Sequence, residues 1–295
     1  MKTESRSRRR GKKAPVYLEE IGDLGIGEAL SPDQQRYHED LFLGRYVKED
    51  LIGMFRDAGI IDVLEAKGYN NLLFKLGRDD QFTSRIFVNF DRDSKDTRLI
   101  ELVVKEASFR PREVFVKGFE WESLLILKIE WLALQDIKGE FSEKKPRLPG
   151  QIYPGLGLLR NIQDVLYRIA ASSHKDAIMD IPEYYHSAFI YSHLYSFYSP
   201  VDSGRLKAMI RDLGGYRLAD VSFAVSLGCL VNEITGLNES WVPSEQIYPI
   251  SSSVKAYVES KAYKEIEKET ADAVRYSIDW ARYRYRLERG DADEI

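Results

Sequence analysis

One stretch of the sequence, residues 123–182, most constrains what this chain can fold into. It holds an almost continuous apolar run, SLLILKIEWLALQD, then a loop rich in proline and glycine, a helical pattern and a second apolar run, DAIMDIP. Apolar runs of this length are typical of buried strands, and the first is predicted to be covered on both faces. Because β-α-β units within one sheet cross over right-handedly, we expect the two strands to be parallel.

The segments before this stretch have a different pattern. NNLLFKLG, SRIFVNFD and RLIELVVKEASF are short β-rich runs separated by polar turns, which predicts an antiparallel meander. We expect a disordered basic tail at residues 1–15 and a helical lead-in at residues 16–68. The predicted fold class is α/β (α+β), with a mixed central sheet in which the meander is followed by a parallel β-α-β-α unit and with extra helices at both ends.

The predicted core spans residues 69–204, and its last part, YYHSAFIYSHLYSFYSP, is expected to be helical. Residues 205–295 are interpreted as a helical C-terminal extension with a long helix from about residue 252 to residue 289. Its apolar context predicts that Cys229 is a small core residue. The run around Trp280 interleaves aromatic and basic residues, which favours either packing against the domain or contact with nucleic acid.

Composition excludes several classes of protein. The formal net charge of −4 argues against duplex binding by the whole surface, so any contact with nucleic acid must be local. A single cysteine, no long apolar window and a charged start of the chain predict a cytoplasmic protein with no membrane segment. Residues 1–13 hold seven basic side chains and one glutamate, which fits either an RNA-binding arm or a solubilising tail.

The loop LPGQIYPGLG, residues 148–157, lies directly before the predicted amphipathic helix. A helix N-terminus offers unpaired amides and a partial positive charge, and glycine lets a phosphate approach the backbone. The loop matches neither the Walker pattern nor the dinucleotide-binding pattern. Taken alone, it is either a phosphate cradle or a tight turn that connects a strand to a helix.

The loop resembles the pyrophosphate loop of the acetyltransferase superfamily called GNAT, which lies between the family's fourth strand and third helix. Gln151, Gly155 and Gly157 carry this resemblance, with one more residue between Gln151 and Gly155 than the family has. The same segment resembles that of bacterial GNAT-like proteins with an LPGQ-x-x-PGLG loop. The resemblance covers about residues 70–200.

A second segment resembles the fourth helix of the GNAT superfamily. Ala188 is followed by a run through Tyr191 to Phe197, with one extra residue before Phe197. His186 stands where the family often has an asparagine, and Ser196 stands near a usual glycine. These departures bear on how a cofactor would be held.

The resemblance implies an acyl-CoA-dependent N-acyltransferase that uses acetyl-CoA or another acyl-CoA as co-substrate and a small-molecule or protein amine as acceptor. The diphosphate would lie on the amides of residues 152–158, and the pantetheine along a fourth strand that parts from the fifth. The cofactor-binding residues implied are Leu132, Ala133, Leu134, Gln151, Ile152, Tyr153, Gly155, Leu156, Gly157, Leu158 and His186.

Two residues are candidates for proton transfer. Glu130 lies inside the apolar fourth run, where burial would adapt it as a general base, and strand alternation places it on one face with Lys128, Leu132 and Leu134. A Lys128–Glu130 surface pair is the alternative. Tyr191 matches the family's acid, and plain packing is its alternative.

No metal site is predicted, because His186 and His193 lie two helical turns apart and have no acidic or sulfur neighbour at metal-ligand spacing. The alternative to an enzyme is a catalytically inactive GNAT-like protein that binds RNA, through the basic N-terminal tail, or another partner.

Overall fold

The computed structural model describes residues 41–292 and 295. The expected tail at residues 1–15, and the lead-in as far as residue 40, lie outside the described residues. The helices are α2 (Lys48–Asp57), α3 (Ile60–Ala66), α4 (Leu159–Ser172), α5 (Tyr185–Tyr191), α6 (Pro200–Leu213), α7 (Leu218–Ser226), α8 (Ser252–Glu259), α9 (Lys261–Ala273) and α10 (Trp280–Glu288), with a short 3-10 helix at Lys95–Thr97.

The strands form one large and one small sheet. They are β1 (Leu72–Arg78), β2 (Thr83–Phe90), β3 (Arg98–Phe109), β4 (Leu124–Leu134), β5 (Ala177–Asp180), β6 (Ser196–Phe197), β7 (Leu230–Asn232), β8 (Leu237–Glu239), β9 (Gln246–Pro249) and β10 (Tyr276–Ile278). The large sheet has seven strands in the order β1-β2-β3-β4-β5-β9-β6. β1 to β4 form an antiparallel meander, and β5 is parallel to β4. This confirms the mixed α/β sheet, the meander and the parallel pair.

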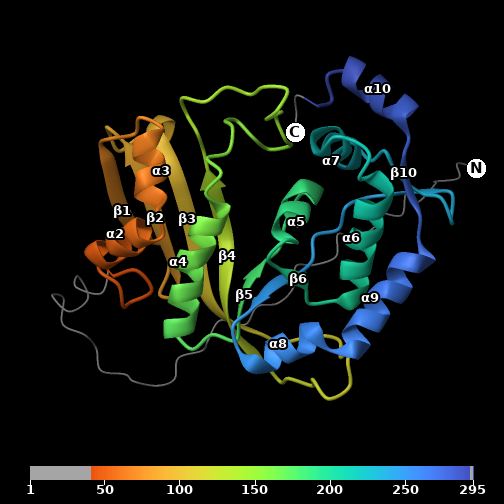
Figure 1. The fold of residues 1–295 in the computed structure, drawn as a ribbon, viewed down its shortest axis with the longest axis horizontal. Coiled ribbons are helices and arrows are strands. Elements are labelled where there is room, and N and C mark those ends of the chain that lie inside the picture. The colour runs from red at the N-terminus through yellow and green to blue at the C-terminus, as the bar shows by residue number, and fades with distance from the viewer. Residues whose placement is uncertain (1–40, 293–294) are drawn as a thin grey trace, which may run out of the picture.

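Helices pack on one face of the meander and form the main hydrophobic core with it. Figure 1 shows α2, α3 and α4 in front of β1–β4, while α5, α6 and α7 lie beyond β5. The predicted apolar stripe of α4 is buried against this core, as Ile162, Val165 and Ile169 show. α4 therefore packs along the sheet as expected, because its apolar residues recur at helical spacing.

A β-bulge interrupts β4. Its register with β3 shifts so that Val104 lies opposite Ile129 and Val103 lies opposite Trp131, which leaves Glu130 as the extra residue. The expected alternation is therefore wrong beyond this point. Leu132 and Leu134 turn to the core on the side of α4, away from the face of Glu130. The expectation that β4 is covered on both faces is also wrong, because Trp131 is 55% exposed.

The region after residue 204 is less helical than expected. Its boundary falls within α6, and β9 enters the large sheet between β5 and β6. β7, β8 and β10 form a separate sheet in the order β10-β7-β8. The expected long helix is divided into α8, α9, β10 and α10, so Tyr276 lies on a strand while Trp280 and Tyr283 lie on α10. Cys229 is fully buried, as predicted, in the turn before β7.

The run expected to be one helix up to Pro200 ends early. α5 stops at Tyr191, and the edge strand β6 follows at Ser196. Phe197 of β6 lies opposite Gln246 of β9, so the residues expected at the end of the helix pair with β9 as an edge strand instead. Within residues 41–292, we find no helix with both the length and the apolar character that a bilayer crossing requires.

Candidate functional site

The parallel strands β4 and β5 part soon after they meet. Pairing joins only three residues of each strand, starting at Ile126 and Ala177, and β5 ends at Asp180. In the described part of the chain, Ile129–Ala133 have no strand partner on the side of β5, although β3 pairs with their other edge. At a rise of about 3.3 Å per residue, this open edge is about 16 Å long. Its unpaired amides and carbonyls are available to an extended ligand.

The glycine loop closes the far end of the open edge. The amide of Leu156 donates a hydrogen bond to the carbonyl of Leu134 at 3.2 Å. The side chains of Leu156 and Leu158 are buried in the core and anchor the loop. Between them, Gly157 has a φ of 78°, and a Cβ there would meet no atom within 4 Å. The loop is thus held against the sheet by two leucines while the backbone between them stays open.

The N-terminus of α4 has no protein cap. Its N-cap is Leu158, whose side chain makes no capping hydrogen bond, and its first turn has no acidic residue. Every other described helix of eight residues or more has a capping side chain or an acidic first turn. Among the described residues, the amides of Gly157, Leu158 and Leu159 donate to no protein acceptor. This end of the helix therefore retains the donors and the partial positive charge that attract an anion.

Two guanidinium groups belong to this part of the chain. Arg160 lies in the first turn of α4 and is exposed. Arg147 donates from Nε to the carbonyl of Gln151 at 3.0 Å. A basic residue in the first turn of a helix is unfavourable toward the helix dipole, so a bound anion would relieve that repulsion.

The residues predicted along the pantetheine fall on the open edge in part. Leu132 and Ala133 lie within it, whereas the carbonyl of Leu134 is taken by the amide of Leu156. In the loop, Ile152 is exposed and Tyr153 is half-buried.

Gln151 and His186 are used differently from the other predicted cofactor residues. The Oε1 of Gln151 accepts from the amide of Leu148 at 3.2 Å, so this side chain braces the turn. His186 is stacked on Tyr184, which in turn contacts Gly150. Burial lowers the pKa of His186 to about 4, and its Nδ1 has no partner. The imidazole is therefore neutral at neutral pH.

The two predicted proton-transfer residues lie in different surroundings. Glu130 accepts a hydrogen bond from the Nζ of Lys128 at 2.9 Å, which is the alternative that sequence reasoning left open. Tyr191 packs against Tyr195, with ring centroids 5.6 Å apart. Burial, and then the charge of Asp180, raise the pKa of Tyr191 above its usual value, so the phenol keeps its proton.

Sequence reasoning missed Asp180, the last residue of β5. It is 9% exposed, and its Oδ2 has no hydrogen-bond partner. Nearby, Tyr195 donates from its hydroxyl to Oε1 of Gln163 at 2.5 Å, while Nε2 of Gln163 has no partner. The signal was an aspartate at the carboxyl end of a short buried strand, two residues before a proline.

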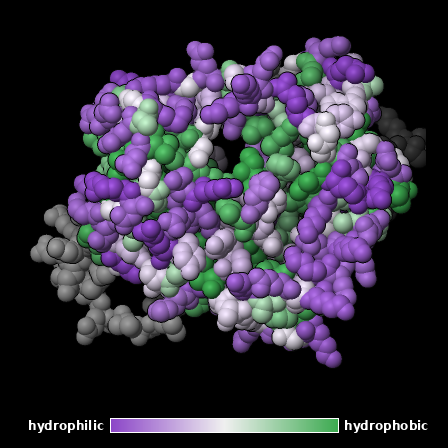
Figure 2. Space-filling view, viewed as in Figure 1, coloured by the Kyte–Doolittle hydropathy of each residue, from purple (hydrophilic) through white to green (hydrophobic). Residues whose placement is uncertain are grey.

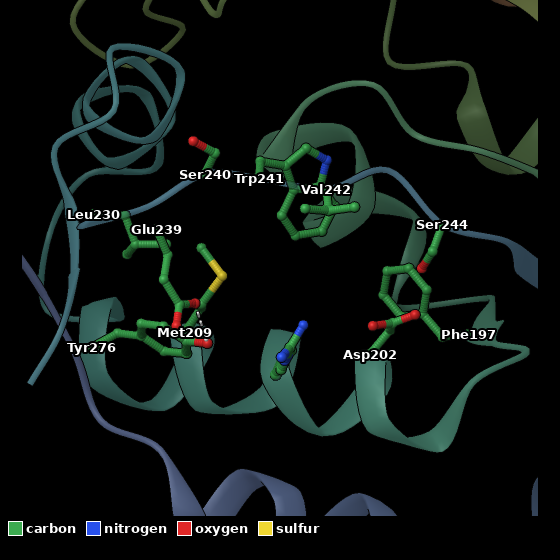
Figure 3. A pocket seen from close by; sticks show the side chains of 11 residues that line it. Phe197, Asp202, Met209, Leu230, Glu239, Ser240, Trp241, Val242, Ser244 and Tyr276 are labelled. Atoms are coloured by element: carbon green, nitrogen blue, oxygen red, sulfur yellow. Dashed lines mark hydrogen bonds between the residues drawn. The ribbon is translucent and has the colours of Figure 1, made fainter. Parts of the chain in front are cut away.

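The molecule has further concave surfaces. Figure 2 shows a hollow with hydrophobic residues at its rim, between the end of β4 and α5. A wide depression of about 570 Å³ lies on the meander face that holds Glu130 and Trp131. A small pocket of about 50 Å³ lies beside α6, where Glu239 accepts a hydrogen bond from Tyr276 (Figure 3). Neither the depression nor the small pocket is lined by a residue of the glycine loop.

Among the described residues, His, Cys, Asp and Glu side chains form no group of three or more that could hold a metal ion. No protein-family model matches the chain, and no curated protein is similar enough to count as a relative.

Proposed function

We propose that this chain is an acyltransferase of the GNAT type, which transfers an acyl group from acyl-coenzyme A to an amine. One observation carries the proposal: the parting of β4 and β5 leads directly to the uncapped N-terminus of α4. The open strand edge offers amides and carbonyls to an extended chain, and the helix end offers donors to a diphosphate. A ligand with both parts is what the GNAT resemblance implies.

The residues present fit such a ligand. The free amides of Gly157, Leu158 and Leu159 would hold the diphosphate, with Arg160 adding charge. The edge at Ile129–Ala133 would pair with the amides of the pantetheine arm. The fit depends on Gly155 and Gly157, because a side chain at either residue would occupy the space that the diphosphate needs.

The chemistry expected is direct transfer. The bound substrate supplies an activated thioester, which an amine attacks. A basic group of the protein removes a proton from the amine, and an acidic group protonates the departing thiolate. Tyr191 suits the acidic role, since its phenol keeps its proton at neutral pH. The strand pattern alone predicts Glu130 as the base, but Lys128 engages this carboxylate at 2.9 Å, so the basic group is sought elsewhere in the fold.

Ligand-dependent stabilisation tests the proposal. Coenzyme A at 100 times its dissociation constant should stabilise the protein by about 2.7 kcal/mol and raise its melting temperature. Gly155→Trp should abolish this rise. A Cβ at residue 155 would approach only the carbonyl oxygen of Leu134, at 3.9 Å, so the variant should fold and fill the cradle.

Gly215→Trp is the matched control, because a Cβ at residue 215 meets no atom within 4 Å and a side chain there has room as well. Residue 215 follows α6, outside the glycine loop. The control should keep the full shift. A wild-type protein whose melting temperature does not move at millimolar coenzyme A, or an equal loss of the shift in both variants, would contradict the proposal.

A further inference from the structure

The strand that parts from β4 ends in a buried carboxylate without a partner. Asp180 is 9% exposed, and its Oδ2 has no hydrogen-bond partner. Across the sheet it lies opposite Gln246 of β9, whose Oε1 also has no partner. Burying an ionisable group without satisfying it is costly, so such groups persist where a ligand or a reaction needs them.

Two other carboxylates with little exposure, one buried and one half-buried, are satisfied in this fold. Glu267 on α9 accepts a hydrogen bond from Ser203 at 2.6 Å and pairs with Lys207 at 2.5 Å. Glu106 on β3 pairs with Lys175 at 2.7 Å and also with Arg45. The same fold therefore provides partners for buried carboxylates elsewhere. Asp180 differs from them by its place at the parting of the strands.

The groups that surround Asp180 come from each element packed against it. Lys128 and Glu130 act on it from β4 with opposite charges, and the amide of Ile181 stabilises its charged form. The pKa values of Tyr191 and Tyr195 are raised by burial and further by the charge of Asp180.

Burial outweighs the favourable contacts and raises the pKa of Asp180 to about 7. The group is thus divided between its two protonation states at neutral pH, which suits a group that must accept a proton and release it again.

We propose that Asp180, rather than Glu130, takes the proton from the acceptor amine. The inference rests on the proposed acyl transfer. The amine nitrogen forms a bond to the thioester carbon, and its proton passes to the unpartnered oxygen of Asp180. The carbon–sulfur bond then breaks, and the sulfur takes the phenol proton of Tyr191. Protonated Asp180 returns a proton to that phenolate, so the enzyme regains its starting state.

Glu130 is less suited to this role. It stands at the bulge of β4, on the face of the wide meander depression, and it is engaged by Lys128 at 2.9 Å. Its Oε2 is occupied by that ammonium group, whereas Oδ2 of Asp180 has no partner. Glu130 therefore serves to hold Lys128. Substitution of Glu130 leaves the ammonium group of Lys128 without its ion pair, at a partly exposed position.

A matched pair of variants, Asp180→Asn and Glu130→Gln, tests this assignment. The assay follows thiol release from acetyl-CoA with spermidine as the probe amine, alongside the thermal shift with coenzyme A. Asp180→Asn should lower the rate by about 100-fold or more while the thermal shift persists. The wild-type rate should rise with pH through about 7, and this limb should disappear in the variant. Glu130→Gln should keep the limb and most of the rate.

Each outcome separates this inference from the proposed function. No thermal shift with coenzyme A overturns both. A thermal shift without thiol release from the wild type overturns the role of Asp180 and leaves the coenzyme A site standing. An Asp180→Asn variant with the wild-type rate and pH profile also overturns it, as does a larger loss in Glu130→Gln. Since Asn has the shape of Asp, the thermal shift of the variant shows whether its site is folded.

Discussion

The meander and the strands beyond it treat buried polar groups differently. At the meander, Glu106 is held by Lys175 and Arg45, and Asp136 accepts hydrogen bonds from Lys67 and Tyr69 at 2.7 Å each. Beyond the parting of β4 and β5, several buried side chains keep atoms without a protein partner, although Glu267 on α9 is paired. These atoms include Oδ2 of Asp180, Nδ1 of His186, Oγ of Ser244 and Oε1 of Gln246, and on α4 Nε2 of Gln163 is also without a partner.

The paired groups of the meander stabilise the folded state, whereas the unpartnered groups beyond β5 destabilise it. A paired buried charge becomes very unfavourable when its partner is removed. An unpartnered buried group has already lost its solvation, so its replacement can stabilise the protein. Substitution of a paired group in the meander should therefore lower the free energy of unfolding, and substitution of an unpartnered group beyond β5 should raise it.

The largest effect is expected at Glu106. Glu106→Gln removes the charge that compensates Lys175, whose side chain is only 7% exposed. We expect a loss of about 3–5 kcal/mol in the free energy of unfolding, because an uncompensated ammonium group remains buried. Urea denaturation at pH 7 measures this loss. A change below about 1 kcal/mol would remove the contrast between the two regions.

The pH dependence of Glu106 follows from its partners. Burial alone would raise its pKa, but hydrogen bonds from Arg45 and Lys175 outweigh burial and lower the pKa. Since the folded pKa is below the unfolded one, its contribution is present above the usual pKa of 4.5 and is lost as the pH falls through the folded value. The difference between wild type and Glu106→Gln should therefore shrink in acid.

The second prediction concerns His186. Burial lowers its pKa from 6.5 to about 4, so the folded state resists protonation while the unfolded chain accepts a proton. Stability is complete above pH 6.5 and falls as the pH drops from there toward 4, by about 3 kcal/mol in all. His186→Gln should lack this loss.

Denaturation curves at pH 7 and pH 4.5, recorded for the wild type and His186→Gln, measure the effect. Their difference in unfolding free energy should change by about 2–3 kcal/mol between the two pH values, in favour of the variant in acid. His193→Gln is the control on the same segment, because His193 is exposed. Equal behaviour of the two variants would show that His186 is solvated.

Much of the fold was readable in the sequence, because long elements have clear periods. The predicted third run coincides with β3, Arg98–Phe109, and the predicted stripe of α4 is buried. The bulge at Glu130 was not readable, since it depends on the register with β3 and not on the sequence of β4. β9 was missed because it is short and pairs with a strand far away in the chain.

The site was readable in part for the same reason. The glycine loop indicated where α4 begins with unpaired amides, because glycine and proline act locally on the backbone. The role of Asp180 depends on α5 and β4, which approach it only in the folded chain. A buried strand that ends in aspartate was the one local sign, and many such aspartates are ordinary partners of cations.

The smallest effect is expected from Asp180→Asn on stability. The rise of its pKa from 3.8 to about 7 corresponds to a cost of about 4 kcal/mol for the ionised form. Because the folded pKa is raised, the cost is absent below about pH 4, grows as the pH increases and is complete above about 7. The asparagine amide lacks a partner in its turn, which offsets about 1–3 kcal/mol. Asp180→Asn should therefore stabilise the protein by about 2 kcal/mol at pH 8 and destabilise it at pH 4.5, as urea denaturation at the two pH values measures. A destabilised variant at pH 8 would mean that Asp180 is ionised and held by the fold, as Glu106 is, and the two regions would then no longer differ.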